Sequence, residues 1–312
     1  MIKNNPIFYP SVSSVAKNRL TALEHIEILS ALKYPSLLIS AFDIFHLNTI
    51  EKEKLQTILK TFESEQVDLI IDSGMYEKVW SQNDSWSYEQ YKNVVKNLSY
   101  NFVFNFDEYI NPKDMPIDAI IKSINQKNIK NLAPILHTKN SADLPELCYQ
   151  IAKLDNVDVI AIPERELGNG ILEGVQTVSK IKQKLLQLDK YKKIHILGTG
   201  NPLSILIYSA FGIDSFDGLD WCQTVVDFES ATLHHSLQLD FFAHQSKFGE
   251  LKEISYITRL FAHNLEFYID WMKNINLEIQ NDSMDEMLKF YLPKSISNII
   301  VQLYGEYHAA TN

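Results

Sequence analysis

Short apolar segments alternate with amphipathic segments along most of the chain. Over residues 16–32, for example, Leu20, Leu23, Ile26 and Leu29 recur at the spacing of a helix. Eight apolar segments predict β-strands, the third running into a glycine-containing turn: 7–12, 36–42, 67–76, 102–109, 132–137, 157–164, 194–198 and 215–219. Because strands that alternate with helices form parallel sheets, the pattern predicts an α/β fold, and eight repeats favour a closed (β/α)8 TIM-type barrel over an open sheet.

The chain changes character after the eighth predicted strand and becomes helical. Apolar positions recur at helical spacing over 254–275 and 282–291. We interpret residues 1–232 as the barrel core and residues 233–312 as a C-terminal helical cap packed on the barrel. Phe267, Trp271 and Met272 lie on one stripe of this cap, which is either core or the exposed face of a homodimer.

The composition is that of a globular enzyme, with 46% hydrophobic and 22% charged residues. No apolar run approaches the roughly 20 residues that span a bilayer, and the first residues, MIKNNP, lack the apolar core of a signal peptide. We therefore expect a cytoplasmic protein without membrane contact. With only Cys148 and Cys222, the chain has neither a disulfide framework nor a cysteine zinc cluster.

The net charge of −10 argues against a broadly basic surface that would bind nucleic-acid phosphates. The one dense basic segment, residues 180–193, has the spacing of the solvated face of a helix. A protein of this charge that acts on nucleic acid is expected to have a limited footprint, or a partner protein that separates the strands.

Polar side chains follow most of the predicted strands. In a (β/α)8 barrel the C-terminal strand ends converge on one mouth. Carboxylates held together there repel one another, which raises at least one pKa and suits general acid/base chemistry. The alternative is that some of them, such as Asp43, Glu108 and Asp214, cap the helices that follow. The groups at the predicted strand ends are Asp43, Asp72, Asp107 with Glu108, His137, Glu164, the 198–200 turn and Asp217.

Residues 195–223 contain a strand, a tight turn at Gly198 and Gly200, a helix that begins at Pro202, and a second strand that carries Asp217. A carboxylate in an otherwise apolar strand has one of two roles. It is structural, bound to backbone N–H groups or to a cation, or it takes part in a chemical reaction. The residues of this segment by themselves leave both interpretations open.

The order of these motifs resembles the tRNA-guanine transglycosylase family. The match consists of L-G-x-G-x-P followed by G-I-D-x-F-D, of D-S-G-M-Y at 72–76, of N-F-D-E at 105–108, and of a C-terminal H-N-L-x-F-Y helix at 263–268. The resemblance implies that Asp217 is the nucleophile that attacks the ribose anomeric carbon, and that Asp72 is the general acid/base at the exchanged purine.

The resemblance also implies how the base is bound, without a cofactor. Asp107 and Glu164 would accept hydrogen bonds from its polar edge, and Tyr76 and Leu197 would hold its faces. An incoming 7-deazaguanine base would then displace Asp217 in a double displacement. The remaining implied substrate-binding positions are Ser73, Gly74, His137 and Gly198.

Several positions depart from the family. Its three zinc-binding cysteines are missing beside His263, and residues 233–247 are too few to hold their loop, so we expect no structural zinc and a packing or hydrogen-bonding role for His263. His234, His235 and His244 are alternative metal ligands without a fixed spacing. His137 replaces a glutamine on strand five, Pro163-Glu164 replaces a glycine pair, and residues 220–222 (DWC) replace P-T-R, which suggests a different substrate.

Within the family, the segment I-P-E-R-E at 162–166 is most similar to the DNA-guanine transglycosylase branch, which inserts 7-deazaguanine bases into DNA. DNA is therefore favoured as the acceptor, with tRNA as the alternative. Two other interpretations stay open. The chain could be an N-glycosidase for small nucleosides, which suits its acidic charge, or a non-catalytic subunit that retains the barrel.

Overall fold

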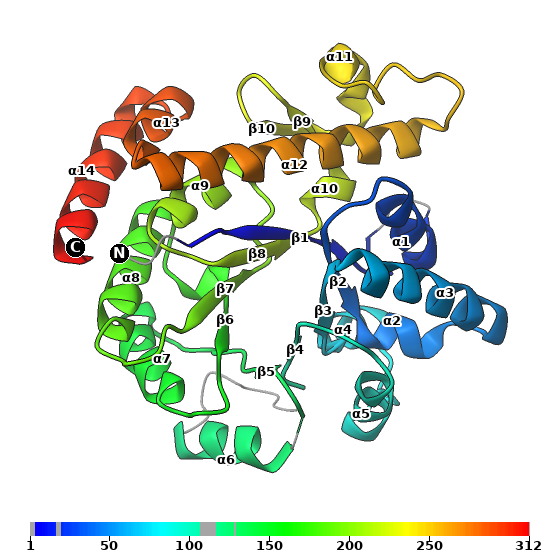
Figure 1. Cartoon of the computed structure of the whole chain (residues 1–312), viewed down its shortest axis with the longest axis horizontal. Helices are drawn as coiled ribbons and strands as arrows, with labels where there is room; N and C mark the ends of the chain where they lie inside the picture. Colours follow the sequence, from blue (N-terminus) through cyan, green and yellow to red (C-terminus); the bar gives the residue numbers. More distant parts are fainter. Residues whose placement is uncertain (1–3, 17–19, 107–116, 128, 312) are drawn as a thin grey trace.

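The computed structural model describes residues 4–16, 20–106, 117–127 and 129–311. Its centre is an eight-stranded parallel sheet in the order β5-β4-β3-β2-β1-β8-β7-β6 (Figure 1). The strands are β1 Ile7–Val12, β2 Ser36–Ser40, β3 Asp68–Asp72, β4 Phe102–Phe104, β5 Leu132–Ala133, β6 Val159–Pro163, β7 Lys193–Leu197 and β8 Ser215–Gly218.

The two outer strands of this order meet and close the sheet. The N–H of Leu136 donates to the Ala161 carbonyl at 2.9 Å, and the Ala161 N–H donates to the Pro134 carbonyl at 2.9 Å. The fold is therefore a (β/α)8 TIM-type barrel with a C-terminal helical region, as the sequence predicted.

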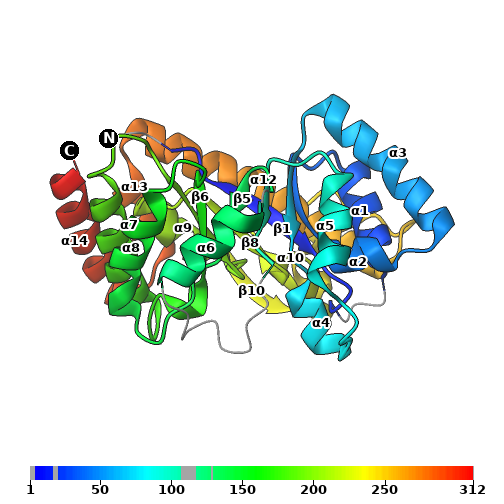
Figure 2. The ribbon, with the colours of Figure 1, turned by 90° about the horizontal axis from the view of Figure 1, so that it is seen from below.

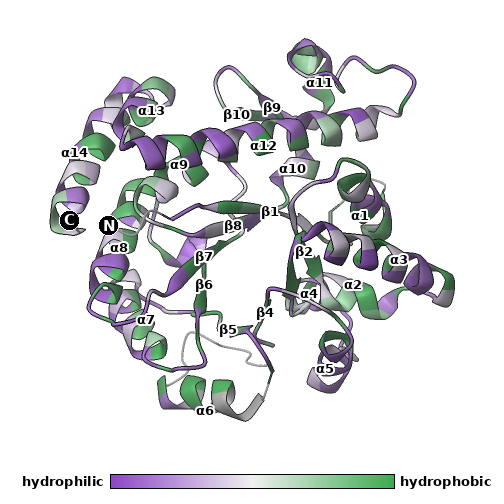
Figure 3. Ribbon diagram, viewed as in Figure 1, coloured by the Kyte–Doolittle hydropathy of each residue, from purple (hydrophilic) through white to green (hydrophobic). Residues whose placement is uncertain are grey.

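Helices cover the outside of the barrel, and their hydrophobic and hydrophilic residues alternate as in amphipathic helices (Figure 3). Several begin at side chains that cap the helix, such as Thr21 before α1 and Asn48 before α3. No helix in the described ranges is long and apolar enough to cross a membrane. These helices are α1 Ala22–Ala31, α2 Ala41–His46, α3 Thr49–Glu65, α4 Met75–Ser81, α5 Tyr88–Lys96, α6 Ile117–Lys127, α7 Leu144–Ala152, α8 Ile171–Leu185 and α9 Pro202–Ala210.

The second strand is shorter than the sequence predicted. It ends at Ser40, and Asp43 lies in the first turn of α2, where its Oδ2 accepts a hydrogen bond from the Ser14 N–H at 2.8 Å. The placement of Asp43 at a strand end was therefore wrong. Short buried apolar runs do not distinguish strand from helix, because both faces of either element are buried.

The barrel interior is filled with side chains. Inward-facing residues of six strands form an apolar cluster that is separate from the core between strands and helices. This barrel is therefore a packed core, and any reaction must take place at its mouth. The cluster comprises Tyr9, Leu38, Ile70, Phe102, Phe104, Ala133, Val159 and Ala161.

The C-terminal region packs against the barrel through the long helix α12, which contacts β1, α1 and α9, and through α13 and α14, which contact α9 and α8 (Figure 1). Phe267, Trp271 and Met272 on this helix are buried, so the stripe is core and not an exposed homodimer face. Neither the β9–β10 hairpin nor α14 was predicted. The elements after β8 include α10 Asp220–Gln223, β9 Thr224–Asp227, β10 Thr232–His235, α11 Leu239–Phe242, α12 Tyr256–Asn281, α13 Met284–Tyr291 and α14 Lys294–Thr311.

The basic segment 180–193 is not only a solvated helix face. Lys182 and Lys192 are each 4% exposed. The Lys182 ammonium donates to Asp214 Oδ2 at 3.2 Å and to the Tyr191 hydroxyl oxygen at 3.0 Å. Asp214 also accepts a hydrogen bond from the Ile194 N–H at 2.8 Å, so it is a structural ion-pair partner and not a helix cap. Burying these charges requires that they be paired.

Lys182→Met is expected to lower the free energy of unfolding by about 3–5 kcal/mol, because it leaves the Asp214 carboxylate buried without its cation. Urea unfolding at neutral pH measures this loss. Lys180→Met, on the exposed side of α8, is the matched control and should change stability by less than about 0.5 kcal/mol. Equal effects of the two substitutions would contradict the structural role of the Lys182 pair.

Candidate functional site

Asp217 on β8 accepts hydrogen bonds from three separate parts of the barrel. Its Oδ1 is 3.0 Å from His195 Nε2 on β7 and accepts the Gly198 N–H at 3.1 Å. Its Oδ2 accepts the Ser11 hydroxyl of β1 at 2.7 Å. The Asp217 side chain is 11% exposed, so it is nearly enclosed but still reaches the surface of the barrel. These donors fix the orientation of the carboxyl group.

The glycines around Asp217 are required by close approach. Gly198 has φ of +75°, a left-handed conformation that directs its N–H at the carboxylate. A Cβ on Gly218 would lie 2.7 Å from the Cα of Gly200, because the turn after β7 packs directly on the end of β8. The glycines of the sequence motif therefore bring the turn into hydrogen-bonding distance of Asp217.

Asp72 ends β3 and accepts the Gly74 N–H at 2.9 Å. Burial, followed by the charges of Asp217 and Asp43, raises the pKa of the Asp72 carboxyl to about 6, against the lowering effect of the Gly74 N–H. Gly74 has φ of +79°, and a Cβ there would lie 2.4 Å from the Cβ of Phe42. The D-S-G motif is thus a rigid turn that holds Asp72.

Asp72 and Asp217 lie at the same end of the barrel. Asp72 is in register with Ser40 on β2, and Asp217 is in register with Tyr9 on β1. Since all these strands are parallel, the carboxyl ends of β3 and β8 face the same side. Figure 2 shows α4, which follows β3, and the β9–β10 hairpin, which follows β8, on that one side.

Glu77 is a third carboxyl group at this mouth that the sequence did not reveal. It lies on α4, is 3% exposed, and accepts hydrogen bonds from the Ser40 hydroxyl at 2.9 Å and from the Ser13 hydroxyl. Burial, followed by the charges of Asp72 and Asp43, raises its pKa to about 8. Glu77 follows Asp72 by five residues. A helix predicted directly after Gly74 would have placed Glu77 in its first turn, close to Asp72.

The other candidate residues occupy different settings around the mouth. Ser73 is buried, and its backbone carbonyl accepts a hydrogen bond from the Trp86 indole N–H at 3.0 Å. This bond holds the turn after β3 in place. Tyr76 on α4 is 50% exposed, with its ring centroid 6.0 Å from that of Trp80. Leu197, at the end of β7, packs against the apolar cluster of the barrel interior.

Two candidates lie on the β5 and β6 side. His137 follows β5, with its Nδ1 3.4 Å from Glu166 Oε1. Glu164 follows β6, where burial and then the charge of Asp220 raise its pKa. Asp107 and Glu108 lie outside the described residues.

The H-N-L-x-F-Y motif on α12 forms hydrogen bonds with the backbone segments that carry the site. Asn264 accepts the Val226 N–H at 3.0 Å and donates to the Trp221 carbonyl at 2.8 Å. The Tyr268 hydroxyl donates to the Gly200 carbonyl at 2.5 Å. Through these bonds α12 holds both the turn after β7 and the segment after β8.

His263 has the hydrogen-bonding role that the sequence suggested. Its Nδ1 is 2.8 Å from the Ser246 hydroxyl and its Nε2 is 2.8 Å from the Val226 carbonyl. Burial lowers its pKa, which favours the neutral ring. In the described ranges no group of three or more His, Cys, Asp or Glu side chains is arranged to hold a metal ion.

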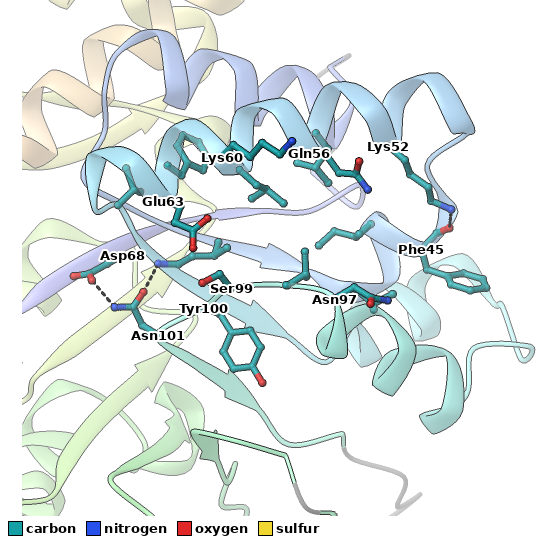
Figure 4. A pocket seen from close by; sticks show the side chains of 18 of the residues that line it. Phe45, Lys52, Gln56, Lys60, Glu63, Asp68, Asn97, Ser99, Tyr100 and Asn101 are labelled. Carbon is teal, nitrogen blue, oxygen red and sulfur yellow. Dashed lines mark hydrogen bonds between the residues drawn. The ribbon is translucent and has the colours of Figure 1, made fainter.

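Two large hollows lie away from the mouth. One of about 820 Å³, between α3 and α5, is lined by apolar side chains such as Leu55 and polar ones such as Lys60 and Asn97 (Figure 4). The other, of about 840 Å³, lies at the N-terminal strand ends near Asn101 and Asp158. None of the candidate site residues lines either hollow.

Glu77→Gln is expected to change the free energy of unfolding by less than about 1 kcal/mol at pH 5 and to raise it by about 4–5 kcal/mol at pH 9. The carboxyl has an ordinary pKa of 4.5 and a folded-state pKa of about 8, so the folded protein holds this proton while the unfolded chain releases it. Wild-type stability therefore falls as the pH rises through that interval, and glutamine cannot ionise.

Urea titrations at pH 5, 7 and 9 test this expectation. Glu53→Gln, which removes an exposed carboxylate from α3, is the control. Parallel pH curves for wild type and Glu77→Gln would show that Glu77 does not carry the buried proton.

Compared with known proteins, the chain matched no family model and no curated sequence. The likeness to the transglycosylase family thus consists of the ordered motifs quoted above. What the structure adds is independent of that likeness: Asp72 and Asp217, 145 positions apart in the sequence, lie at one end of a closed barrel.

Proposed function

We propose that this protein is a transglycosylase that exchanges guanine in nucleic acid, with DNA as the favoured acceptor, for a 7-deazaguanine base. The observation that supports this most is the pairing of Asp217, oriented by three hydrogen-bond donors, with the protonatable Asp72 at the same barrel mouth. The exchange is a double displacement through a covalent Asp217 glycosyl ester.

The two carboxyl groups suit the two roles that this chemistry needs. In retaining glycosyl transfer one carboxylate is the nucleophile and the other carries a proton. With a pKa of about 6, Asp72 can protonate the departing base and accept a proton from the incoming one close to neutral pH. Asp217, held in one orientation, attacks the anomeric carbon from a fixed direction.

The acceptor must present one base at the barrel mouth, which in duplex DNA requires base flipping at a cost of a few kcal/mol. Arg165 follows β6 at this mouth, with 75% of its side chain exposed, and suits a phosphate contact. The net charge of −10 leaves little further attraction for nucleic acid, so the proposal includes a partner protein that opens the duplex.

A second candidate is an N-glycosidase that acts on small nucleosides. The same carboxyl pair would serve it, with water in place of the incoming base. The acidic overall charge favours it, because a small uncharged nucleoside needs no basic surface.

Radiolabelled guanine exchange by the full chain tests both candidates. The wild type is expected to label DNA, and Asp217→Ala to lose at least about 10³-fold in rate because the nucleophile is gone. Glu53→Gln, which removes an exposed carboxylate from the outer helix α3, is the control and should retain full activity.

Three other outcomes of this assay would distinguish between the candidates. Labelling of tRNA alone would replace DNA by tRNA as the acceptor. Release of guanine from guanosine without labelling of any polymer would favour the glycosidase. The absence of every activity, with and without cell extract, would overturn the proposed function.

A further inference from the structure

His195 occupies the centre of the barrel interior and is fully buried. It is enclosed by aromatic rings, with centroids at 6.2 Å for Tyr9, 5.9 Å for Phe102 and 5.0 Å for Phe104. A histidine in such surroundings needs hydrogen-bond partners. Its Nδ1 is 2.8 Å from the Ser215 hydroxyl, and its Nε2 is 3.0 Å from Asp217 Oδ1.

Strand register produces this line of three side chains. His195 on β7 is the direct neighbour of Ser215 on β8. Asp217 lies two residues further along β8, and residues two apart point to the same face of a strand. The ring therefore bridges two successive inward-facing residues of the neighbouring strand.

We propose that His195 is the positioning residue of the nucleophile: it fixes Oδ1 of Asp217 and leaves Oδ2 as the oxygen that attacks the sugar. This inference rests on the proposed function. It adds which carboxylate oxygen reacts and which side chain determines that choice.

Counting acceptor sites identifies the free oxygen. An ionised carboxylate has about four lone-pair sites, two on each oxygen. Oδ1 uses two of them, for His195 and for the Gly198 N–H, whereas Oδ2 uses one, for Ser11. Oδ2 therefore keeps a lone pair, and the Ser11 hydroxyl can rotate about one bond, while the enclosed imidazole cannot turn.

The role requires a particular tautomer of the ring. An ionised carboxylate only accepts hydrogen bonds, so the proton must be on Nε2. The Asp217 carboxylate thus sets the position of this proton, as the partner of one ring nitrogen commonly does for the other. The Ser215 hydroxyl, 2.8 Å from Nδ1, can donate or accept a hydrogen bond and suits that arrangement.

The two displacement steps use these bonds in succession. In the first, the bond from Oδ2 to C1′ forms, the bond from C1′ to the base breaks, and the base leaves with the bonding electron pair and a proton from Asp72. Oδ1 is now the carbonyl oxygen of an ester. In the second, the incoming base loses its proton to Asp72 and attacks C1′, and the ester electron pair returns to the carboxylate. His195 and Gly198 donate to the oxygen on which part of that charge develops.

Three variants of the full chain test this role in the exchange assay. His195→Leu removes the donor and is expected to lower kcat by about 10²-fold with KM unchanged. His195→Gln places an amide N–H near the position of Nε2 and should recover at least about tenfold of that loss. Ser215→Ala keeps the ring but removes the hydrogen-bond partner of Nδ1 that helps hold it, and should lower kcat without the loss of volume that could unfold a barrel interior. Thermal unfolding of each variant controls for folding.

Two results in this assay would overturn the inference. One is an exchange rate of His195→Leu equal to that of the wild type. The other is an equal loss in His195→Leu and His195→Gln, since a role in packing alone is not rescued by an N–H.

Long-range ¹H–¹⁵N spectra of the histidine-labelled full chain provide a readout that needs no activity. The His195 signals, identified by their absence in His195→Gln, are expected to show a proton on Nε2, and to shift in Asp217→Asn. A ring protonated on Nδ1 alone would overturn the positioning role even in an active enzyme. A wild type with the expected spectrum but no exchange activity would instead overturn the proposed function, and with it any catalytic use of the bond.

Discussion

A carboxylate enclosed in a barrel wall must accept hydrogen bonds. The donors that Asp217 requires determine how the strand ends and the turn around it are arranged. Its donors come from β1, from β7 and from the turn after β7, because β8 lies between β1 and β7 in the sheet. Strands vary less in position than loops do, so the candidate nucleophile is held by the most rigid part of the fold. The helix α12 extends this support, because Tyr268 binds the carbonyl of Gly200 in that same turn.

The two ends of the barrel use buried charge in opposite ways. Near the N-terminal ends of the strands, Asp214 is paired with the Lys182 ammonium and contributes to stability. At the mouth, the partners that the described residues offer to Asp72 and Glu77 are hydroxyl and N–H groups and like charges, and burial raises both pKa values. Asp214 and Asp217 are three residues apart, yet one is part of an ion pair and the other is the candidate nucleophile. This division is typical of (β/α)8 barrels, where the N-terminal face stabilises and the C-terminal face reacts.

The packing of the barrel interior restricts any chemistry to the mouth. Aromatic and aliphatic side chains of the described residues fill the interior around His195. The ring of His195 packs beside Phe102 and Phe104 in the interior, and its Nε2 lies 3.0 Å from Asp217 Oδ1 at the mouth. His195 therefore contacts both the interior and the mouth. A buried polar group of this kind is stabilising only while both of its partners remain in place.

The alternation of apolar and amphipathic segments was enough to predict a parallel α/β barrel, because strands connected through helices pair in parallel and eight repeats favour closure. The predicted strand ends and the motif resemblance singled out Asp72 and Asp217, and the structure adds that Gly74 and Gly218 are needed there because backbone segments approach closely. The sequence could not show that Asp43 belongs to a helix, that Glu77 and Lys182 are buried, or that His195 contacts Asp217. Burial and pairing depend on residues that are distant along the chain, such as Ser13 with Glu77, and only the closed tertiary structure decides which of them meet.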